Sequence, residues 1–126
     1  MSFVVCDVTS LESVSNLWKE AVKAFKSNGV DLWVNNAGVM GEKEGWKKCM
    51  DINLVGVLNG ITVAISGLED KGGQNVTVVN VASILGLFSA KQPKGWAYNT
   101  SKSAVVTASR CIGYGVSNVR MVRKHS

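Results

Sequence analysis

Tyr98 and Lys102 are the residues of this sequence whose types and spacing most directly suggest proton chemistry. Residues four apart lie on the same face of a helix, one turn from each other. An ammonium next to a phenol favours the phenolate, which can accept a proton from a hydroxyl and return it to a carbonyl. The same spacing is also common on solvated helix faces, so the surrounding elements must distinguish the two interpretations.

Polar side chains follow each of three apolar, strand-like runs. The runs are Phe3–Cys6, Leu32–Val34 and Val76–Val81, and the polar residues after them are Asp7, Asn35, Asn36 and Ser83. In open α/β sheets, ligands bind beyond the carboxyl ends of the strands. We therefore expect these side chains to gather along one edge of the molecule.

Three segments between and after these runs carry apolar residues at helical spacing. They extend from Leu11 to Phe25, from about Glu44 to Lys71, and from about Tyr98 to Cys111. Residues 118–122 could form one further strand. The alternation of strands and helices, without a repeat or an internal linker, predicts a single α/β domain over residues 1–126. We expect a doubly wound parallel sheet with helices on both faces.

Local signals predict the ends and the packing of these helices. Thr9 and Glu12 form a capping-box pattern before the first helix, and Gly29 suits a left-handed position after it. Gly56 lies in the second helix, where the missing side chain permits close approach of another element. Asn53 lies in the same, otherwise apolar helix, where a polar side chain needs a partner or a function.

The composition excludes several classes of protein. Apolar residues make up 46% and charged residues 18% of the chain, as in a globular domain. The net charge of +5 comes mostly from dispersed lysines, which argues against nucleic-acid binding. The three cysteines are far apart and the only histidine is His125, so no metal site is expected. No leader and no apolar run near membrane-spanning length occur, and we expect a cytoplasmic protein without a membrane span.

The polar residues, in this order, resemble the motifs of the short-chain dehydrogenases/reductases. The matching elements are the Asn35–Gly38 loop, Asn53, Ser83 and the Tyr98–Lys102 helix. The segments CDVTS, DLWVNNAGV and DINLVGV, and the Gln-Pro pair before the tyrosine, look like NAD-dependent hydroxyprostaglandin dehydrogenases, with insect alcohol dehydrogenases as near relatives. The resemblance covers about residues 3–120 and implies a Rossmann-like fold.

The resemblance implies a catalytic role for several of these residues. Tyr98 would be the general acid and base, and Lys102 would assist it while holding the nicotinamide ribose hydroxyls. Ser83 would hydrogen-bond the substrate oxygen, and Asn53 would hold a water that relays protons to the lysine. Gln92 matches a substrate-contacting glutamine of the prostaglandin enzymes.

The resemblance also implies a cofactor site and a reaction. Asp7 and Val8 would contact adenine, and Asn35, Ala37 and Gly38 would line the adenosine side of the cofactor. The reaction would be hydride transfer between NAD and a secondary alcohol or ketone, such as a hydroxyprostaglandin or another lipid alcohol. The position that selects NAD over NADP has no counterpart here, so NADP stays an alternative.

Each matched residue also has a purely structural interpretation. Asp7 could be only a turn and helix-start residue, and Asn35 and Asn36 could form a left-handed turn. Ser83 could cap a strand end, and Asn53 could be a core amide with satisfied hydrogen bonds.

The glycine-rich turn Gly-x-x-x-Gly-x-Gly, which holds the pyrophosphate in this family, does not occur among the 13 glycines. We expect a partial Rossmann-like sheet without the first two strands and the C-terminal part of the family fold. In the family's strand order, two strands would separate residues 3–6 from residues 32–34, a gap of roughly 14 Å. Either residues 3–6 shift to pair with residues 32–34, or an apolar edge stays bare and promotes association.

Three functions from different classes fit these residues. The first is an oxidoreductase of the family whose isolated chain has little or no activity. The second is a non-catalytic protein that uses its long helices to form a homodimer or to pair with a full-length relative. The third is a regulatory domain of the flavodoxin or receiver kind, which needs an acidic cluster or a phosphate loop that Asp7 alone does not supply.

Overall fold

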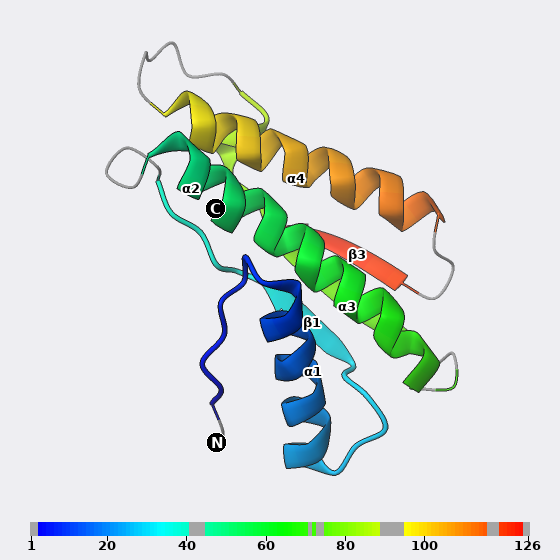
Figure 1. The fold of residues 1–126 in the computed structure, drawn as a ribbon. Coiled ribbons are helices and arrows are strands. Elements are labelled where there is room, and N and C mark those ends of the chain that lie inside the picture. Colours follow the sequence, from blue (N-terminus) through cyan, green and yellow to red (C-terminus); the bar gives the residue numbers. More distant parts are fainter. Residues whose placement is uncertain are drawn as a thin grey trace.

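Three parallel strands form the sheet of the computed structural model, which describes residues 3–40, 45–70, 72, 75–88, 95–115 and 119–124. The strands are β1 (Leu32–Asn35), β2 (Val76–Val81) and β3 (Val119–Lys124), in the order β1-β2-β3 (Figure 1). β2 pairs with both neighbours in parallel. The predicted parallel sheet is confirmed, and β2 has the predicted bounds because valine and threonine favour a strand between two others.

Helices alternate with these strands along the chain. They are α1 (Leu11–Phe25), α2 (Trp46–Met50), α3 (Gly56–Asp70) and α4 (Trp96–Gly115). A π-helical turn, η1 (Asp51–Val55), joins α2 to α3 without a break, and a 3-10 turn, η2 (Ile84–Gly86), follows β2. The continuous helix over residues 46–69 is long and apolar enough to cross a membrane by those criteria alone. A core helix passes the same test, and 44% of its apolar window is buried in the fold.

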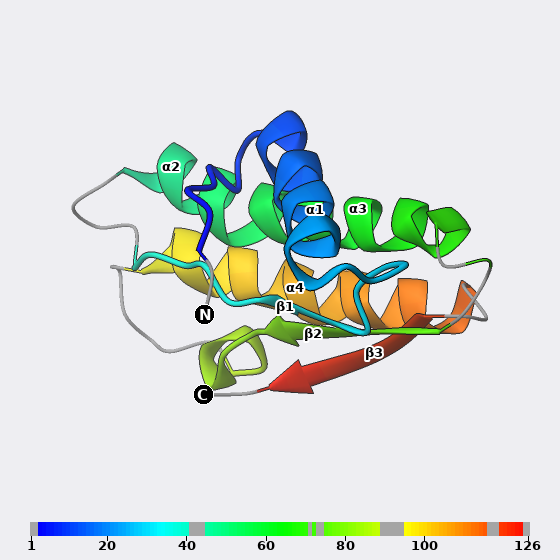
Figure 2. The same cartoon turned by 90° about the horizontal axis from the view of Figure 1, so that it is seen from below.

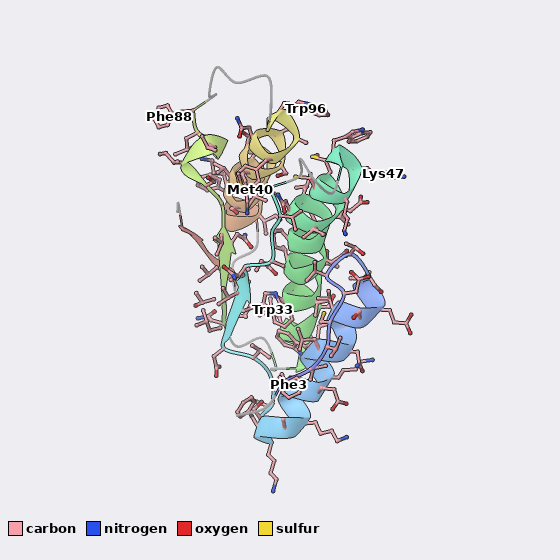
Figure 3. All side chains as sticks on the ribbon, turned by 90° about the vertical axis from the view of Figure 1, so that its left-hand side faces the viewer. Phe3, Trp33, Met40, Lys47, Phe88 and Trp96 are labelled. Atoms are coloured by element: carbon pink, nitrogen blue, oxygen red, sulfur yellow. The ribbon has the colours of Figure 1, made fainter. Side chains whose placement is uncertain are left out.

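The described helices lie on one face of the sheet (Figures 2 and 3). Both crossovers, from β1 to β2 and from β2 to β3, step across the sheet in the same direction. Because such crossovers are right-handed, their helices fall on the same face. The expected second layer of helices is therefore not seen among the described residues, and Leu32 and Val34 are exposed on the other face.

Phe3–Cys6 is not a strand, which corrects the prediction from its apolar composition. Phe3 and Val5 are each 91% exposed. The end of the segment is fixed to α1 instead, since the Asp7 N–H donates to Ser13 Oγ at 3.0 Å. We expected either that residues 3–6 pair with residues 32–34 or that an apolar edge stays bare. Among the described residues, the second outcome is found, because no strand pairs with the outer edge of β1.

Both ends of α1 differ from the prediction. The N-cap is Ser10, whose Oγ accepts from the Ser13 N–H at 3.2 Å, because the hydroxyl of Thr9 is used in the preceding turn. At the other end Lys26, with φ of 50°, takes the left-handed position predicted for Gly29.

Glycines of α3 let the core pack closely. A β-carbon at Gly60 would lie 2.8 Å from Trp33 Nε1, and one at Gly67 would overlap the indole ring of Trp18. The two indole centroids are 5.7 Å apart, so both rings lie between the sheet and the helices. The apolar residues buried around them include Val14, Val57, Ile61, Val76, Val78 and Val105.

Candidate active site

Tyr98 and Lys102 lie in the first two turns of α4, beside the carboxyl end of β2. Lys102 is only 4% exposed, and its Nζ donates to the carbonyl of Val81 at 2.8 Å. The same Nζ is 5.7 Å from the centroid of the Tyr98 ring, within range of a cation–π interaction. Burial lowers the pKa of Lys102, and the nearby Cys49 opposes this shift. The predicted pair therefore exists, with a buried cation next to a half-buried phenol.

Asn53 is fully buried in the π-helical turn η1, and its amide holds the loop after β1. Its Oδ1 accepts from the Val39 N–H at 2.7 Å, and its Nδ2 donates to the Val39 carbonyl at 2.9 Å. Nδ2 also contacts Ser101 Oγ at 3.2 Å and Cys49 Sγ at 3.3 Å. Asn53 thus is a satisfied core amide, and it joins the loop to α4.

Gly38 connects these two parts of the site. A β-carbon at Gly38 would lie 3.4 Å from Asn53 Oδ1 and 3.5 Å from Lys102 Nζ. The glycine therefore leaves space directly beside the buried ammonium, at a point where the loop is exposed. The structure brings Gly38, Asn53 and Lys102 together from three separate segments of the chain.

Ser83 follows β2 on the same side of the molecule. It is buried, and its Oγ accepts from the Leu85 N–H at 3.3 Å, so it caps η2. This turn packs on α4, where Ser103 Oγ donates to the Gly86 carbonyl at 2.8 Å. Ser83 therefore lies near the turn of α4 that carries the lysine. Gln92 lies outside the described residues.

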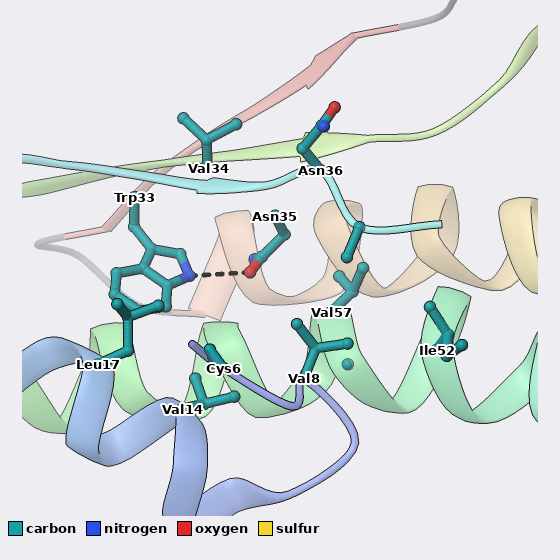
Figure 4. Close-up of a pocket in the computed structure, with 12 residues that line it drawn as sticks. Cys6, Val8, Val14, Leu17, Trp33, Val34, Asn35, Asn36, Ile52 and Val57 are labelled. Atoms are coloured by element: carbon teal, nitrogen blue, oxygen red, sulfur yellow. Dashed lines mark hydrogen bonds between the residues drawn. The ribbon is translucent and has the colours of Figure 1, made fainter. Parts of the chain in front are cut away.

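A small pocket of about 150 Å³ lies between Val8 and the loop after β1, and Asp7 is not among the residues that line it (Figure 4). Val8 and Ala37 line it, and Ala37 is exposed at its edge. The Asn59 amide on α3 donates to the Val8 carbonyl at 2.9 Å, which holds the turn in place. The Asp7 carboxylate accepts from the Thr9 N–H and hydroxyl, and these hydrogen bonds lower its pKa.

Asn35 also lines this pocket, but its amide belongs to a chain of hydrogen bonds. Oδ1 accepts from Trp33 Nε1 and Nδ2 donates to Asn80 Oδ1, both at 2.8 Å. Asn80 in turn donates to Ser109 Oγ at 2.9 Å. Lys26 is the only non-glycine residue with positive φ among the described residues, so the left-handed turn considered for Asn35 is wrong.

Several polar partners at the site were not predicted from the sequence. Cys49 precedes Asn53 by four residues and Ser101 follows Tyr98 by three, so helical spacing could have found both. No sequence signal marks the carbonyls of Val39 and Val81, because any residue carries one. The indoles of Trp46 and Trp96, 6.1 Å apart, are a further unpredicted pair.

Apolar side chains are exposed at this end of the molecule. Met40, Phe88 and Trp96 all lie there (Figure 3), and each is exposed. Among the described residues, no group of three histidine, cysteine or acidic side chains could hold a metal ion.

A sequence model for the short chain dehydrogenases matches residues 1–122. The chain belongs to this family. Human 15-hydroxyprostaglandin dehydrogenase [NAD(+)] is 34% identical over 110 residues, which are 86% of this chain and 39% of the relative. Alcohol dehydrogenase 2 of Ceratitis rosa is 32% identical over 124 residues, covering 92% of this chain and 45% of the relative. The chain thus spans less than half the length of these curated relatives.

Solved structures of short-chain dehydrogenases have the same fold. One from Mycobacterium smegmatis has a TM-score of 0.82 at 29% identity, over 98% of this chain and 53% of its own. Another, from Burkholderia phymatum in complex with NAD, has a TM-score of 0.81 at 29% identity, over 95% and 45%. The Rossmann-like architecture of this part of the family is therefore present.

Proposed function

We propose that this chain carries the proton-transfer site of an NAD-dependent oxidoreductase that interconverts a secondary alcohol and a ketone. The observation that carries the proposal is the buried Lys102 ammonium, which lies beside the Tyr98 ring and beside the space left by Gly38. Burying a lysine whose ammonium bonds to one carbonyl costs free energy of folding. Ionisable groups perturbed in this way cluster at functional sites. The family supports an oxidoreductase, and the names of relatives support NAD.

Tyr98 takes the hydroxyl proton of the alcohol as a general base and returns it to the ketone in the reverse direction. Lys102 holds its ammonium beside the Tyr98 ring during this transfer. Ser83 donates a hydrogen bond to the substrate oxygen. When bound, NAD would supply the hydride acceptor for the carbon that bears this hydroxyl, so the alcohol would lose one proton and one hydride.

The residues present fit the two ends of NAD. The ammonium of Lys102 has three N–H donors, one of which goes to Val81, and the ribose hydroxyls suit the others. The apolar pocket between Val8 and Ala37 suits the flat adenine ring. Asn53 holds the loop that joins the two ends. For the pyrophosphate, the 126 residues contain no glycine-rich turn, so we expect weak binding and little turnover by this chain alone.

The apolar end near Met40, Phe88 and Trp96 favours a lipid-like alcohol as substrate. Such a molecule buries hydrocarbon against these side chains while its hydroxyl reaches Tyr98. A hydroxyprostaglandin fits this description, in agreement with the name of the human relative. Gln92 is a further candidate for the substrate contact.

The test separates binding from turnover. NAD binding to the purified chain is measured by saturation-transfer NMR, and NADH formation from a hydroxylated fatty acid by absorbance. Lys102→Met should weaken binding, and Lys19→Met, at an exposed position of α1, should leave it unchanged. Tyr98→Phe should keep binding and abolish any turnover. Equal binding by the Lys102→Met and unmodified chains contradicts the proposal, as does turnover that survives Tyr98→Phe.

A second candidate is a non-catalytic chain that pairs with a longer relative through its long helices, on which the apolar side chains of Val55 and Leu58 are exposed. Co-purification with such a relative, without NAD binding or turnover, would support this function over the first. In either case, measurement of the protein's mass in solution would show whether it forms a homodimer.

A further inference from the structure

The thiol of Cys49 is a buried polar group at the candidate site that the proposed reaction does not use. Cys49 lies in α2 and is fully buried. Its Sγ is 3.3 Å from Asn53 Nδ2 and 3.6 Å from the carbonyl oxygen of Val39. The same residue is close enough to Lys102 of α4 for their charges to interact. The sulfur therefore lies where α2, the loop after β1 and α4 come together.

The side-chain amide of Asn53 has two N–H hydrogens, and three acceptors lie within reach of them. The acceptors are the Val39 carbonyl at 2.9 Å, Ser101 Oγ at 3.2 Å and Cys49 Sγ at 3.3 Å. The hydroxyl of Ser101 donates its own hydrogen to the Tyr98 carbonyl at 2.7 Å, so toward Asn53 it can only accept. One N–H of Asn53 therefore goes to Val39, and the other is shared between the oxygen of Ser101 and the sulfur of Cys49.

The thiol hydrogen completes these hydrogen bonds. Cys49 S–H donates to the Val39 carbonyl, whose second lone pair accepts from Asn53. Burial raises the pKa of Cys49, although Ser101 and Lys102 oppose this shift, so the thiol keeps its hydrogen at neutral pH. The side chain at position 49 thus donates toward the loop and accepts from the amide. An apolar side chain of similar size can do neither.

We propose that Cys49 is a positioning residue, whose thiol fixes the Asn53 amide in the orientation that holds the loop at Val39 beside Lys102. Asn53 holds this loop by hydrogen bonds to the N–H and to the carbonyl of Val39. Gly38 comes directly before Val39 and borders the space next to the ammonium. A shift of the loop would change this space, which the proposed function assigns to the ribose end of NAD. Only this last step rests on the proposed function.

Two substitutions separate hydrogen bonding from packing at position 49. Cys49→Ser keeps a donor and an acceptor in a smaller side chain, and Cys49→Val fills the space without either. The side-chain N–H groups of Asn53 should exchange with solvent about fivefold faster in Cys49→Val, because their partner is lost. In Cys49→Ser they should exchange as slowly as in the unmodified chain. NMR of the chain without NAD measures these rates, and circular dichroism checks that each variant is folded.

NAD binding, measured by saturation-transfer NMR, is the second readout and should weaken in Cys49→Val but not in Cys49→Ser. Cys111→Val, at an exposed cysteine, is the matched control and should change neither readout. If Cys49→Val does not fold, Cys49→Ala removes the same hydrogen bonds without adding bulk.

Slow exchange at Asn53 in Cys49→Val, together with fast exchange in Cys49→Ser, would show that the sulfur only fills space and would overturn the proposal. Equal rates in all the variants would overturn it too. Faster exchange in Cys49→Val, with no NAD binding even by the unmodified chain, would support the positioning of Asn53 and contradict the proposed function alone.

Discussion

Lys102 is an ionisable group whose burial disfavours its charged form. Its ammonium lies beneath α4 with the Val81 carbonyl and the Tyr98 ring, where water cannot fully solvate the charge. Burial therefore lowers its pKa below the ordinary value of 10.5. A group of this kind links the stability of the fold to pH as well as serving a reaction.

The linkage has a definite sign. Between the lowered and the ordinary pKa of Lys102, the unfolded chain binds more protons than the folded chain, so the free energy of unfolding increases with pH. The stability of the unmodified chain relative to Lys102→Met should therefore increase as the pH rises toward 10.5. Urea unfolding of both proteins over the alkaline range measures this difference. A difference between the two proteins that stays flat over this range would contradict the prediction.

Asn53 is a second residue with effects beyond its own position. Asn53→Ala leaves the N–H and carbonyl of Val39 without their partner and should lower the free energy of unfolding by about 2–4 kcal/mol. Asn16→Ala, at an exposed position of α1, should change it by less than about 0.5 kcal/mol. Chemical denaturation compares the two. A small loss for Asn53 would mean that water replaces its hydrogen bonds.

The element α3 depends on its glycines for contact with the core. Gly67→Ala would push a methyl group into the Trp18 indole, and the buried ring has little room to move. We expect a loss of about 1–3 kcal/mol in unfolding free energy. Gly115→Ala, with nothing within 4 Å, should be neutral or should stabilise α4 by up to about 1 kcal/mol. Thermal unfolding of both variants checks this. Equal stabilities of the two variants would contradict the close contact between Gly67 and the Trp18 indole.

The elements differ in how far the sequence predicts them. β2 is predicted from Val76 to Val81 because its residues and its surroundings favour the same conformation. Phe3–Cys6 has similar composition, but a strand also needs a partner, which local sequence does not reveal. α4 continues past Cys111 to Gly115 although these last residues are exposed and glycine has a low helix propensity, so the sequence ends the predicted helix too early.

The sequence likewise predicts some features of the candidate site and leaves others unpredicted. Spacing alone predicts that Tyr98 and Lys102 share a face, and the order of motifs predicts which strand ends meet. The hydrogen bonds of Asn53 to Val39, and of Lys102 to Val81, involve backbone groups that carry no sequence signal. The Asn35–Asn80 bond requires the strand register, which becomes known only with the sheet.

In the part of the chain that the structure describes, the helices lie on one face of the sheet, and the exposed apolar side chains of Leu32 and Val34 lie on the other. Such a molecule gains stability by association, so its melting temperature should rise with protein concentration. Calorimetry of the unmodified chain tests this over a range of concentrations. Val34→Lys should melt at one temperature throughout, as a monomer does. A sharp transition of the unmodified chain that does not depend on concentration would contradict the prediction.

The four tryptophans of the chain form two separate pairs, and this arrangement makes the protein its own spectroscopic probe. Trp18 and Trp33 lie in the core, so their emission should shift to longer wavelength only when the chain unfolds. Trp46 and Trp96 are exposed at the candidate site, where a small quencher such as iodide can reach them. Protection of the second pair by a ligand, with the first pair unchanged, would distinguish occupancy of the site from a change in folding.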